Sequence, residues 1–466
     1  MSKRLLTMGM TLAFAAGAAG QMPGQGAAGA LAGISLQGGV PQGTVSATPV
    51  TLSLDDAIAR GLRANLGLLL SSSAETSARA ARLRSLSSLL PQVNGSLREA
   101  ETKINLQAFG FSFPGVNPIV GPFRLFDLRA AVHQPVLAVA AWDDYRAARV
   151  RRQAAQLDYA GTRDLVVLAV ANQYLLTSAA YSRVTAAQAQ LRTAEQAFGQ
   201  AQDMKRSGVV SGLDVVRAQV ERERERQFAI AARNDLAKQE LRLARVIGLP
   251  PGQSFTLSDE IPYVPLAPLQ LPALIGEALQ TRADYRAAQA RVHAGELALA
   301  AARAQRLPTA NFDADYGTIG NRYNSNHPTF TLAGSLNLPV FTGGRIRAAV
   351  LEAQTQLQDA RNRAADLRAG VEDDVRTALL DVQSSQQQVA VAQGARALAA
   401  QELTLARDRF QAGVAGNLEE VQAQQEVAVA DENYIAGLYS FNAAKASLAR
   451  ALGVAETAYK QYLRGR

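Results

Sequence analysis

The chain has 466 residues, of which 48% are hydrophobic and 6% aromatic, and lysine plus arginine exceed aspartate plus glutamate by eight. This composition supplies enough apolar surface for a core and therefore excludes wholesale disorder, but it lacks the long apolar runs of a multi-span helical membrane protein. There is no cysteine and there are only three histidines. Disulfides, thiolate metal sites, a cysteine nucleophile and a lipid attached through an N-terminal cysteine are therefore excluded.

The amino terminus has the pattern of a secretory signal peptide. Lys3 and Arg4 precede an apolar run over residues 5–19, which small residues follow. A single membrane anchor is the alternative, but the run is shorter than the roughly 20 apolar residues that a membrane span needs. We therefore expect residues 1–20 to be removed on export, and export argues against nucleic acid as a partner. Residues 21–50 are rich in Gly, Ala and Gln and are expected to form a flexible lead-in.

An internal repeat occupies most of the chain beyond residue 50. At an offset of 217, Leu52, Leu54, Ile58, Leu62 and Pro91 fall on Leu269, Leu271, Ile275, Leu279 and Pro308. At an offset of 205, Gly208, Leu213, Val216 and Gly248 fall on Gly413, Leu418, Val421 and Gly453. We place the two copies at 51–249 and 269–456, with residues 457–466 as a C-terminal tail. The Pro-rich linker 250–268 between them is expected to hold neither helix nor sheet.

Each copy shows the same order of patterns: a helix, two alternating segments and two very long helices. The alternation predicts four strands, at about 92–111, 123–135, 309–319 and 329–339, with a bulge around Glu99 to Glu101 in the first. Strands of about ten residues, apolar on one side and charged on the other, suit a membrane barrel with a wet lumen. A half-buried soluble sheet would show the same alternation, so the strands alone leave both interpretations open. Trp142 and Tyr145 follow the second strand and indicate either a membrane interface or ordinary packing.

Two proline-free stretches follow the strand pairs, from Pro135 to Pro250 and from Pro339 to the end of the chain. A heptad runs through both in the same register, with Val170, Thr177, Val184, Leu191 and Phe198 in the first and Val375, Val382, Val389, Arg396, Leu403 and Phe410 in the second. This spacing predicts long helices packed along one another. Each stretch breaks at a short turn, at 207–214 and at 412–419. Gly208 and Gly413 are predicted C-caps, Ser211 with Asp214 forms a predicted capping box, and Gly416 with Glu419 takes its place in the second turn.

These residues resemble the TolC-like outer-membrane efflux proteins. The resemblance covers nearly everything after residue 50: the opening Thr51-Leu52-Ser53-Leu54-Asp55-Asp56-Ala57, the strand-closing Leu338-Pro339-Val340-Phe341-Thr342-Gly343-Gly344-Arg345, and the turn from Arg206 to Val215. It implies an α+β membrane protein that forms a homotrimer, with four transmembrane β-strands per chain contributing to a 12-stranded outer-membrane β-barrel. The long antiparallel helical hairpins would form a periplasmic helical barrel.

The resemblance also implies the function and the partners. The chain would be the exit duct of a tripartite efflux or type I secretion system, spanning outer-membrane lipid and joined to a periplasmic adaptor (a membrane fusion protein) and an inner-membrane transporter. The implied adaptor-docking residues at the turns are Arg206, Gly208, Ser211, Leu213, Asp214, Gly413, Gly416 and Leu418. An acidic pore constriction is implied at Asp214, Glu419 and Glu420, with either Glu419 or Glu420 pointing inward.

The sequence contains few residue patterns that would indicate another function. No nucleophile–base constellation, phosphate loop or metal cluster is present, so we expect no enzyme activity, no cofactor and no metal site. The run Arg222-Glu223-Arg224-Glu225-Arg226 alternates in charge and is predicted to be a solvated or intersubunit face. The alternative function is a periplasmic coiled-coil scaffold or adaptor without a pore. The cargo stays open among drug, metal ion, siderophore and polypeptide.

Overall fold

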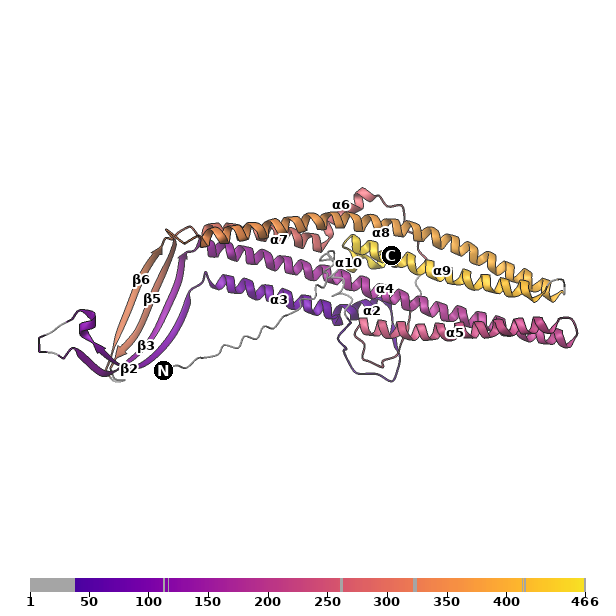
Figure 1. Cartoon of the computed structure of the whole chain (residues 1–466), viewed down its shortest axis with the longest axis horizontal. Helices are drawn as coiled ribbons and strands as arrows, with labels where there is room; N and C mark the ends of the chain where they lie inside the picture. Colours follow the sequence, from indigo (N-terminus) through magenta and orange to yellow (C-terminus); the bar gives the residue numbers. More distant parts are fainter. Residues whose placement is uncertain are drawn as a thin grey trace, which may run out of the picture.

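The computed structural model of the chain describes residues 38–111, 114–115, 117–259, 263–321, 325–412, 414 and 416–464. The predicted signal peptide, most of the lead-in and Gly413 of the second predicted turn lie outside these residues. The molecule is elongated (Figure 1): a sheet occupies one end, long helices run along the body, and two helical hairpins turn at the other end.

The order of the larger elements is the same in the two halves of the chain. The first half contains β1 (Val50–Leu52), α2 (Leu54–Ala64), α3 (Leu66–Ser87), β2 (Gln92–Asn105), a 3₁₀ turn η1 (Leu106–Phe109), β3 (Ile119–Leu137), α4 (Val139–Arg206) and α5 (Gly212–Val246). The second half contains β4 (Phe255–Leu257), α6 (Leu271–Thr281), α7 (Ala283–Ala304), β5 (Thr309–Gly320), β6 (Asn326–Asn337), α8 (Arg345–Gln411), α9 (Asn417–Ala451) and α10 (Ala455–Arg464). In both halves two helices lead into a strand pair, and a long helical hairpin follows it.

The two longest helices, α4 with 68 residues and α8 with 67, run without a break. At 1.5 Å per residue each is about 100 Å long. Of the predicted heptad residues, Arg396 is exposed, whereas six are buried: Val170, Thr177, Val375, Val382, Val389 and Phe410. The seven-residue spacing therefore marks the packed face except at Arg396.

Each strand pair is preceded by two helices rather than by the single helix that the sequence predicted. The break between α2 and α3 lies at Asn65, whose backbone is extended (φ −62°, ψ 126°) and whose side chain accepts a hydrogen bond from the Leu68 amide at 3.3 Å. Arg282 makes the corresponding break between α6 and α7 with ψ 116°. An extended residue cannot continue a helix, so each pair bends at that point.

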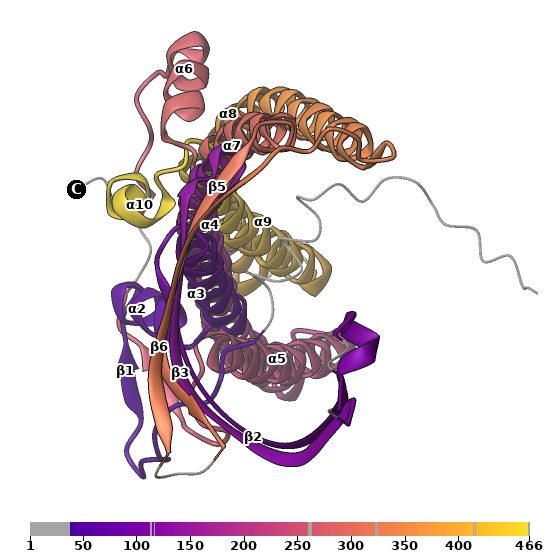
Figure 2. The same ribbon diagram turned by 90° about the vertical axis from the view of Figure 1, so that its left-hand side faces the viewer.

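The sheet is antiparallel and follows the order β2-β3-β5-β6. It is curved along its length (Figure 2), and β2 and β6 are its open edges. The register shift in β2 lies between Thr102 and Ile104, directly after the range Glu99 to Glu101 in which a bulge was predicted. Beyond the last β3–β5 pair, Phe126 with Gly320, the β2–β3 ribbon continues alone.

The two faces of the sheet differ in chemistry. One face carries exposed apolar side chains from all four strands: Val93, Leu97, Leu128, Phe312, Tyr316, Phe330, Leu332 and Leu336. The opposite face carries polar and charged side chains, including Arg98, Asp127, Arg129, His133, Asp313 and Asp315. Phe330 and Leu332 are 70% and 66% exposed, which is unusual for a soluble sheet, whose apolar face is normally covered.

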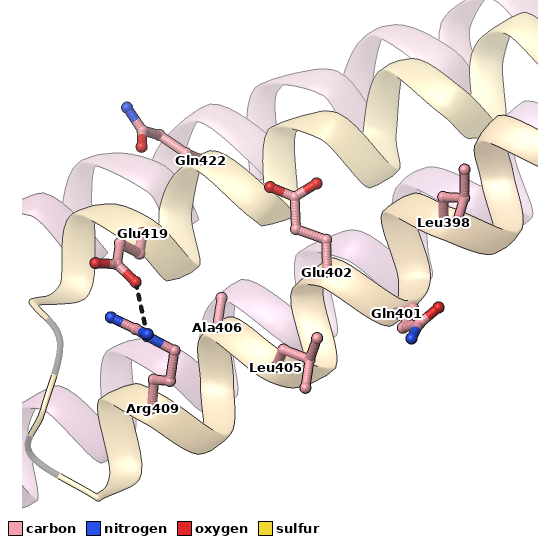
Figure 3. A pocket seen from close by; sticks show the side chains of 8 residues that line it. All are labelled: Leu398, Gln401, Glu402, Leu405, Ala406, Arg409, Glu419 and Gln422. Atoms are coloured by element: carbon pink, nitrogen blue, oxygen red, sulfur yellow. Dashed lines mark ion pairs between the residues drawn. The ribbon is translucent and has the colours of Figure 1, made fainter.

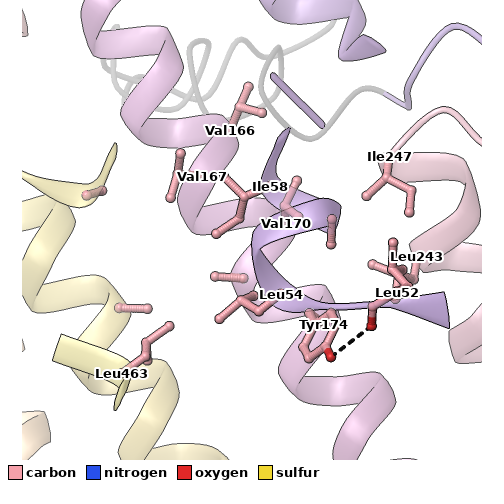
Figure 4. Close-up of a cluster of buried hydrophobic side chains, with 14 of the residues drawn as sticks. Leu52, Leu54, Ile58, Val166, Val167, Val170, Tyr174, Leu243, Ile247 and Leu463 are labelled. Carbon is pink, nitrogen blue, oxygen red and sulfur yellow. Dashed lines mark hydrogen bonds between the residues drawn. The ribbon is translucent and has the colours of Figure 1, made fainter. Parts of the chain in front are cut away.

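The main cores lie halfway along the body, where the short helices meet the long ones. In the first (Figure 4), Leu52, Leu54 and Ile58 pack against the α4 residues Val166, Val167, Val170 and Tyr174. Leu243 of α5, Ile247 just after α5, and Leu463 of α10 complete this core. The Tyr174 hydroxyl donates to the Leu52 carbonyl oxygen at 3.2 Å, so its one polar group is satisfied within the core. A second core is built around Val371, Val375, Val382, Phe441 and Leu448.

Three segments are more ordered than the sequence predicted. The linker contains β4, which pairs in parallel with β1, since its prolines flank rather than interrupt Phe255–Leu257. Part of the lead-in docks on helix ends, with the Gly39 amide donating to the Arg245 carbonyl oxygen at 2.6 Å. The C-terminal tail is mostly helix α10, whose Leu463 is fully buried.

Candidate functional site

The first hairpin turn, between α4 and α5, is fixed by two local motifs. The Val209 amide donates to the Met204 carbonyl oxygen at 2.9 Å and the Gly208 amide to that of Lys205 at 3.0 Å. With Gly208 at φ +74°, this is a Schellman ending, which glycine adopts without steric cost. The returning helix starts at Ser211, as the sequence predicted.

Asp214 completes the capping box of that returning helix. Its Oδ2 accepts from the Ser211 amide at 3.1 Å and from the Ser211 hydroxyl at 2.7 Å. Its Oδ1 lies 3.8 Å from Nη1 of Arg217. In the single chain Asp214 therefore caps a helix, which favours a structural role for this predicted constriction residue.

The second turn, between α8 and α9, is tied to the first. Gly416 is the N-cap of α9 with φ −81° and contributes no side chain. Asn417, 1% exposed, donates from Nδ2 to the Asp214 carbonyl oxygen at 2.9 Å. Because this bond joins residues 203 positions apart, it holds the two hairpin tips together. No local sequence pattern marks Asn417 for this role, because its partner lies on the other hairpin.

Glu419 and Glu420 point in different directions. Glu419 is half exposed and forms an ion pair with Arg409 at 3.2 Å. Glu420 is 1% exposed, with Oε1 3.3 Å from Nε of Arg407 and 3.4 Å from Nε2 of Gln424. A carboxylate packed in this way does not face a lumen in the single chain. Of the two acids, Glu419 is therefore the one available to a pore or a partner.

A groove of 450 Å³ runs along the α8–α9 hairpin close to its tip (Figure 3). The residues that line it are Leu398, Gln401, Glu402, Leu405, Ala406, Arg409, Glu419 and Gln422. Leu398 and Leu405 are largely exposed, and the Arg409–Glu419 pair closes the end next to the turn. A groove that combines exposed leucines with polar side chains and an ion pair at one end can receive an amphipathic helix.

The charged run on α5 is not wholly solvated. Glu221 and Glu225 are both 4% exposed and share one cation, Arg224, which lies in contact with Glu221 and 3.5 Å from Glu225. Gln425 of α9 faces the same guanidinium. The expectation of a solvated face is thus wrong for Glu225, because residues 221 and 225 lie on the buried side of α5. Burial raises the pKa of both carboxyl groups, although Arg224 acts in the opposite direction.

The buried acids predict a pH dependence of the tip contact. A carboxyl whose pKa is raised on folding adds stability that is complete below its ordinary pKa of about 4.5 and is lost as the pH rises through the raised value. Acidification from pH 7 to pH 5 should therefore slow amide exchange in 214–230 and 417–430 several-fold after correction for the intrinsic rate. Glu221→Gln combined with Glu225→Gln should abolish most of this change. The matched variant Glu223→Gln, on an exposed carboxylate, should keep it, and an equal loss in both variants would contradict the assignment.

The polar face of the sheet forms a second charged region. Arg129 contacts Asp315 on β5, lies 3.3 Å from Asp127 on its own strand, and donates to the Thr329 hydroxyl of β6 at 3.3 Å. Nδ1 of His133 lies 2.6 Å from Oδ1 of Asp313. These bonds link neighbouring strands across one face, as expected of a surface that meets water.

Comparison with known proteins gives the family. A profile of the outer membrane efflux protein family matches residues 72–249 and 274–454. The outer membrane protein OprJ of Pseudomonas aeruginosa is 27% identical over 312 residues, or 62% of each chain. The pyoverdine export outer membrane protein OpmQ of Pseudomonas putida is 27% identical over 220 residues, 46% of this chain and 44% of OpmQ. The cation efflux system protein CusC of Escherichia coli is 26% identical over 319 residues, 62% of this chain and 64% of CusC. Each alignment spans less than two thirds of the relative.

Solved channel structures share the fold over nearly the whole described chain. The CmeC outer membrane channel of Campylobacter jejuni superimposes with a TM-score of 0.73 over 86% of both chains, at 18% identity. The open state of the MtrE outer membrane channel of Neisseria gonorrhoeae gives 0.71 over 90% of this chain and 95% of MtrE, also at 18% identity. The mostly helical architecture with a four-stranded antiparallel sheet is therefore the fold of these channels.

Proposed function

The chain belongs to the outer membrane efflux protein family, and we propose that it is the outer-membrane exit duct of a tripartite efflux or type I secretion system. One observation carries the proposal: a sheet with an uncovered apolar face stands at one end of the molecule and two hairpin tips stand at the other. The apolar face suits lipid, while helices about 100 Å long, α4 and α8, suit a passage that reaches through the periplasm.

The duct is proposed to be a homotrimer. A four-stranded sheet leaves the backbone groups of β2 and β6 unpaired, which the hydrocarbon core of a membrane does not tolerate. Three chains joined edge to edge supply twelve strands, within the range of bacterial outer-membrane barrels. In this arrangement the face with Arg129 and His133 lines the lumen, and the face with Phe330 and Leu332 meets lipid.

The hairpin tips are proposed to dock the periplasmic adaptor, through which an inner-membrane transporter delivers the cargo. The docking set is Arg206, Gly208, Ser211, Leu213, Asp214, Gly413, Gly416 and Leu418. The exposed Leu213 and Leu418, together with the groove on α8 and α9, support this by offering apolar surface beside the turns. The names of similar proteins mention pyoverdine export and cation efflux, so we place cargo choice in the pump and adaptor.

The proposal includes the processing of the chain and its division into segments. Residues 1–20 are a signal peptide and 21–50 a lead-in. The repeats at 51–249 and 269–456, joined by the linker 250–268, each give one strand pair to the barrel and one hairpin to the helical tunnel, and residues 457–466 form the tail.

A channel measurement on detergent-purified protein tests the proposed function. Light scattering should give three chains per particle, and the same sample should form conducting channels in planar bilayers. If the acidic tips line the narrowest point, the channel should prefer cations. A monomer that never conducts would instead support the periplasmic scaffold.

The two neighbouring glutamates separate pore lining from structure. Glu419→Gln should weaken cation selectivity with little loss of stability, because this carboxylate is half exposed. Glu420→Gln should leave selectivity unchanged but destabilise the tip by roughly 1–3 kcal/mol, because it unbalances a buried pair with Arg407. The reversal potential and the thermal midpoint distinguish the two effects. An unchanged reversal potential in Glu419→Gln would leave Glu419 without a role in the constriction.

A further inference from the structure

Arginines gather where the helices meet the sheet. The last turns of α3 carry Arg79, Arg82 and Arg84, with no acidic residue between 76 and 88. These residues lie within about 15 Å of the helix end, since each residue adds 1.5 Å. Four residues separate the end of α3 at Ser87 from the start of β2 at Gln92, so the three arginines lie near the end of the sheet that meets the helices.

The other helices that meet the sheet share this bias. Arg303 and Arg306 are at or just beyond the end of α7, and Arg345 and Arg347 begin α8, where Glu352 is the single acid among the first ten residues. The start of α4, residues 139–149, is balanced, with two arginines and two aspartates. Together the four helix ends hold nine arginines, three acids and no lysine. The far end of the sheet, residues 99–125, has two acids and two bases.

Most of this positive charge is not neutralised within the described chain. Of the nine arginines only Arg146 has a carboxylate within 4.0 Å among the described residues, that of Asp143 at 3.2 Å. Eight are exposed, and Arg82 is partly buried. A symmetric trimer multiplies the nine arginines and the three acids of these helix ends equally, so the ratio of three arginines to one acid is kept in the assembly.

The arginines also follow an apolar and an aromatic layer. The apolar face of the sheet continues past β6 into Val340 and Phe341, 88% and 90% exposed. Trp142, 53% exposed, lies 5.8 Å from the ring of Tyr145, and Arg82 donates to the Tyr145 hydroxyl at 3.2 Å. Apolar surface on the side of the sheet, with aromatic rings and cations together on the side of the helices, matches the change in a leaflet from hydrocarbon to the interface that holds the phosphates.

We propose that these helix ends form an arginine belt that binds the phosphate groups of anionic phospholipids in the periplasmic leaflet of the outer membrane. The belt rests on the proposed function, because it takes the apolar face of the sheet as the lipid-facing face. Guanidinium suits this partner because it presents a planar set of donors that grips phosphate oxygens in pairs, whereas lysine offers a point charge. The belt would fix the depth and tilt of the barrel and seat the duct in membrane patches rich in anionic lipid.

The test is lipid competition on the full chain. Trimers in detergent are mixed with equal amounts of phosphatidylglycerol and phosphatidylcholine of the same chain length, and native mass spectrometry counts the lipids retained. The protein should keep phosphatidylglycerol over phosphatidylcholine by about fivefold or more, the ratio that about one cation–phosphate contact supplies. The variant with Arg79, Arg84, Arg303 and Arg306 changed to Gln should bring the ratio close to one.

A matched variant removes the same charge elsewhere. Arg226, Arg233, Arg363 and Arg376 are exposed on the long helices away from the sheet, and changing these four to Gln should preserve the preference. Equal loss in both variants, or an unchanged preference in the first, overturns the belt. A shifted reversal potential with normal lipid retention also overturns it, because the arginines would then act on the lumen.

Two further readouts keep the result interpretable. If the fourfold variant does not assemble, Arg79→Gln with Arg84→Gln and Arg303→Gln with Arg306→Gln are tested as separate pairs, each of which should lower the ratio. Conductance in planar bilayers is recorded on the same samples. A wild-type trimer that retains phosphatidylglycerol but does not conduct would contradict the proposed exit duct and would still support lipid binding by the arginine belt.

Discussion

Replacing Leu332 with arginine is expected to abolish assembly in the outer membrane, whereas the same replacement at the adjacent Thr331 leaves assembly intact. Leu332 lies near the middle of β6 on the apolar face and is 66% exposed. An arginine near the bilayer midplane costs about 2–4 kcal/mol on the lipid face of a barrel, and a trimer carries three copies. Since each 1.4 kcal/mol is about tenfold, the heat-modifiable band of the outer-membrane fraction should fall by more than about tenfold.

Thr331 is the matched control because it points to the opposite face. It pairs with Asp315 of β5, whose carboxylate already contacts Arg129, so an added guanidinium there meets a counter-charge. Loss of assembly in Thr331→Arg alone would mean that the faces are reversed. Normal assembly of both variants would show that the sheet does not span the membrane and would favour the periplasmic scaffold.

The features that sequence reasoning located well are those set by local chemistry. α4 ends at Arg206 and α5 begins after Ser211 because a glycine able to adopt positive φ and a serine with an acid three residues later determine those boundaries without distant contacts. The strands were found because an uncovered sheet with one wet face has strict alternation, which a sheet buried on both sides would lack.

The features that were missed depend on which surfaces meet across long stretches of chain. β4 exists only because β1, 205 residues earlier in the chain, offers it an edge. Glu221, Glu225 and Glu420 lie in polar helical sequence, and their burial follows from the contact between the two hairpin tips. The repeat offset predicted that the hairpins are alike, but it carried no information on how they pack against each other. The hydrogen bond from Asn417 to the Asp214 carbonyl oxygen is one of the contacts through which the two hairpins pack.

The helix breaks at Asn65 and Arg282 differ in how far local sequence predicts them. Asn65 is a good N-cap in the middle of an apolar pattern, so the signal was present but was outweighed by the periodicity on both sides. Arg282 offers no such signal. It is 3% exposed and paired with Asp284 at 2.8 Å and Asp374 at 2.7 Å, so α8 together with its own chain neighbour sets its conformation.

Replacing Gly208 with valine is expected to reduce export and adaptor crosslinking by more than about tenfold while the trimer and its melting temperature stay normal. Gly208 has φ +74°, and a Cβ added there would meet nothing within 4 Å. The cost is thus purely one of backbone conformation, roughly 1–2 kcal/mol, and greatest for a β-branched residue. Relief of that strain must break the bonds from Gly208 and Val209 to the end of α4, which would re-aim the tip about 100 Å from the sheet.

Two substitutions separate tip geometry from a general effect of valine or of losing a glycine. Gly199 lies nine residues earlier inside α4, has no positive φ and has open space around its Cβ position, so Gly199→Val should leave export near normal. Asparagine tolerates the left-handed region better than other side chains, so Gly208→Asn should restore most of the export that Gly208→Val loses. The repeat offset extends the same expectation to Gly413→Val. Full export by both valine variants at the tips would show that these turns do not couple the duct to the adaptor. The conformation of the backbone is the property that a glycine contributes at such an open, solvent-facing turn, and docking would then not depend on it.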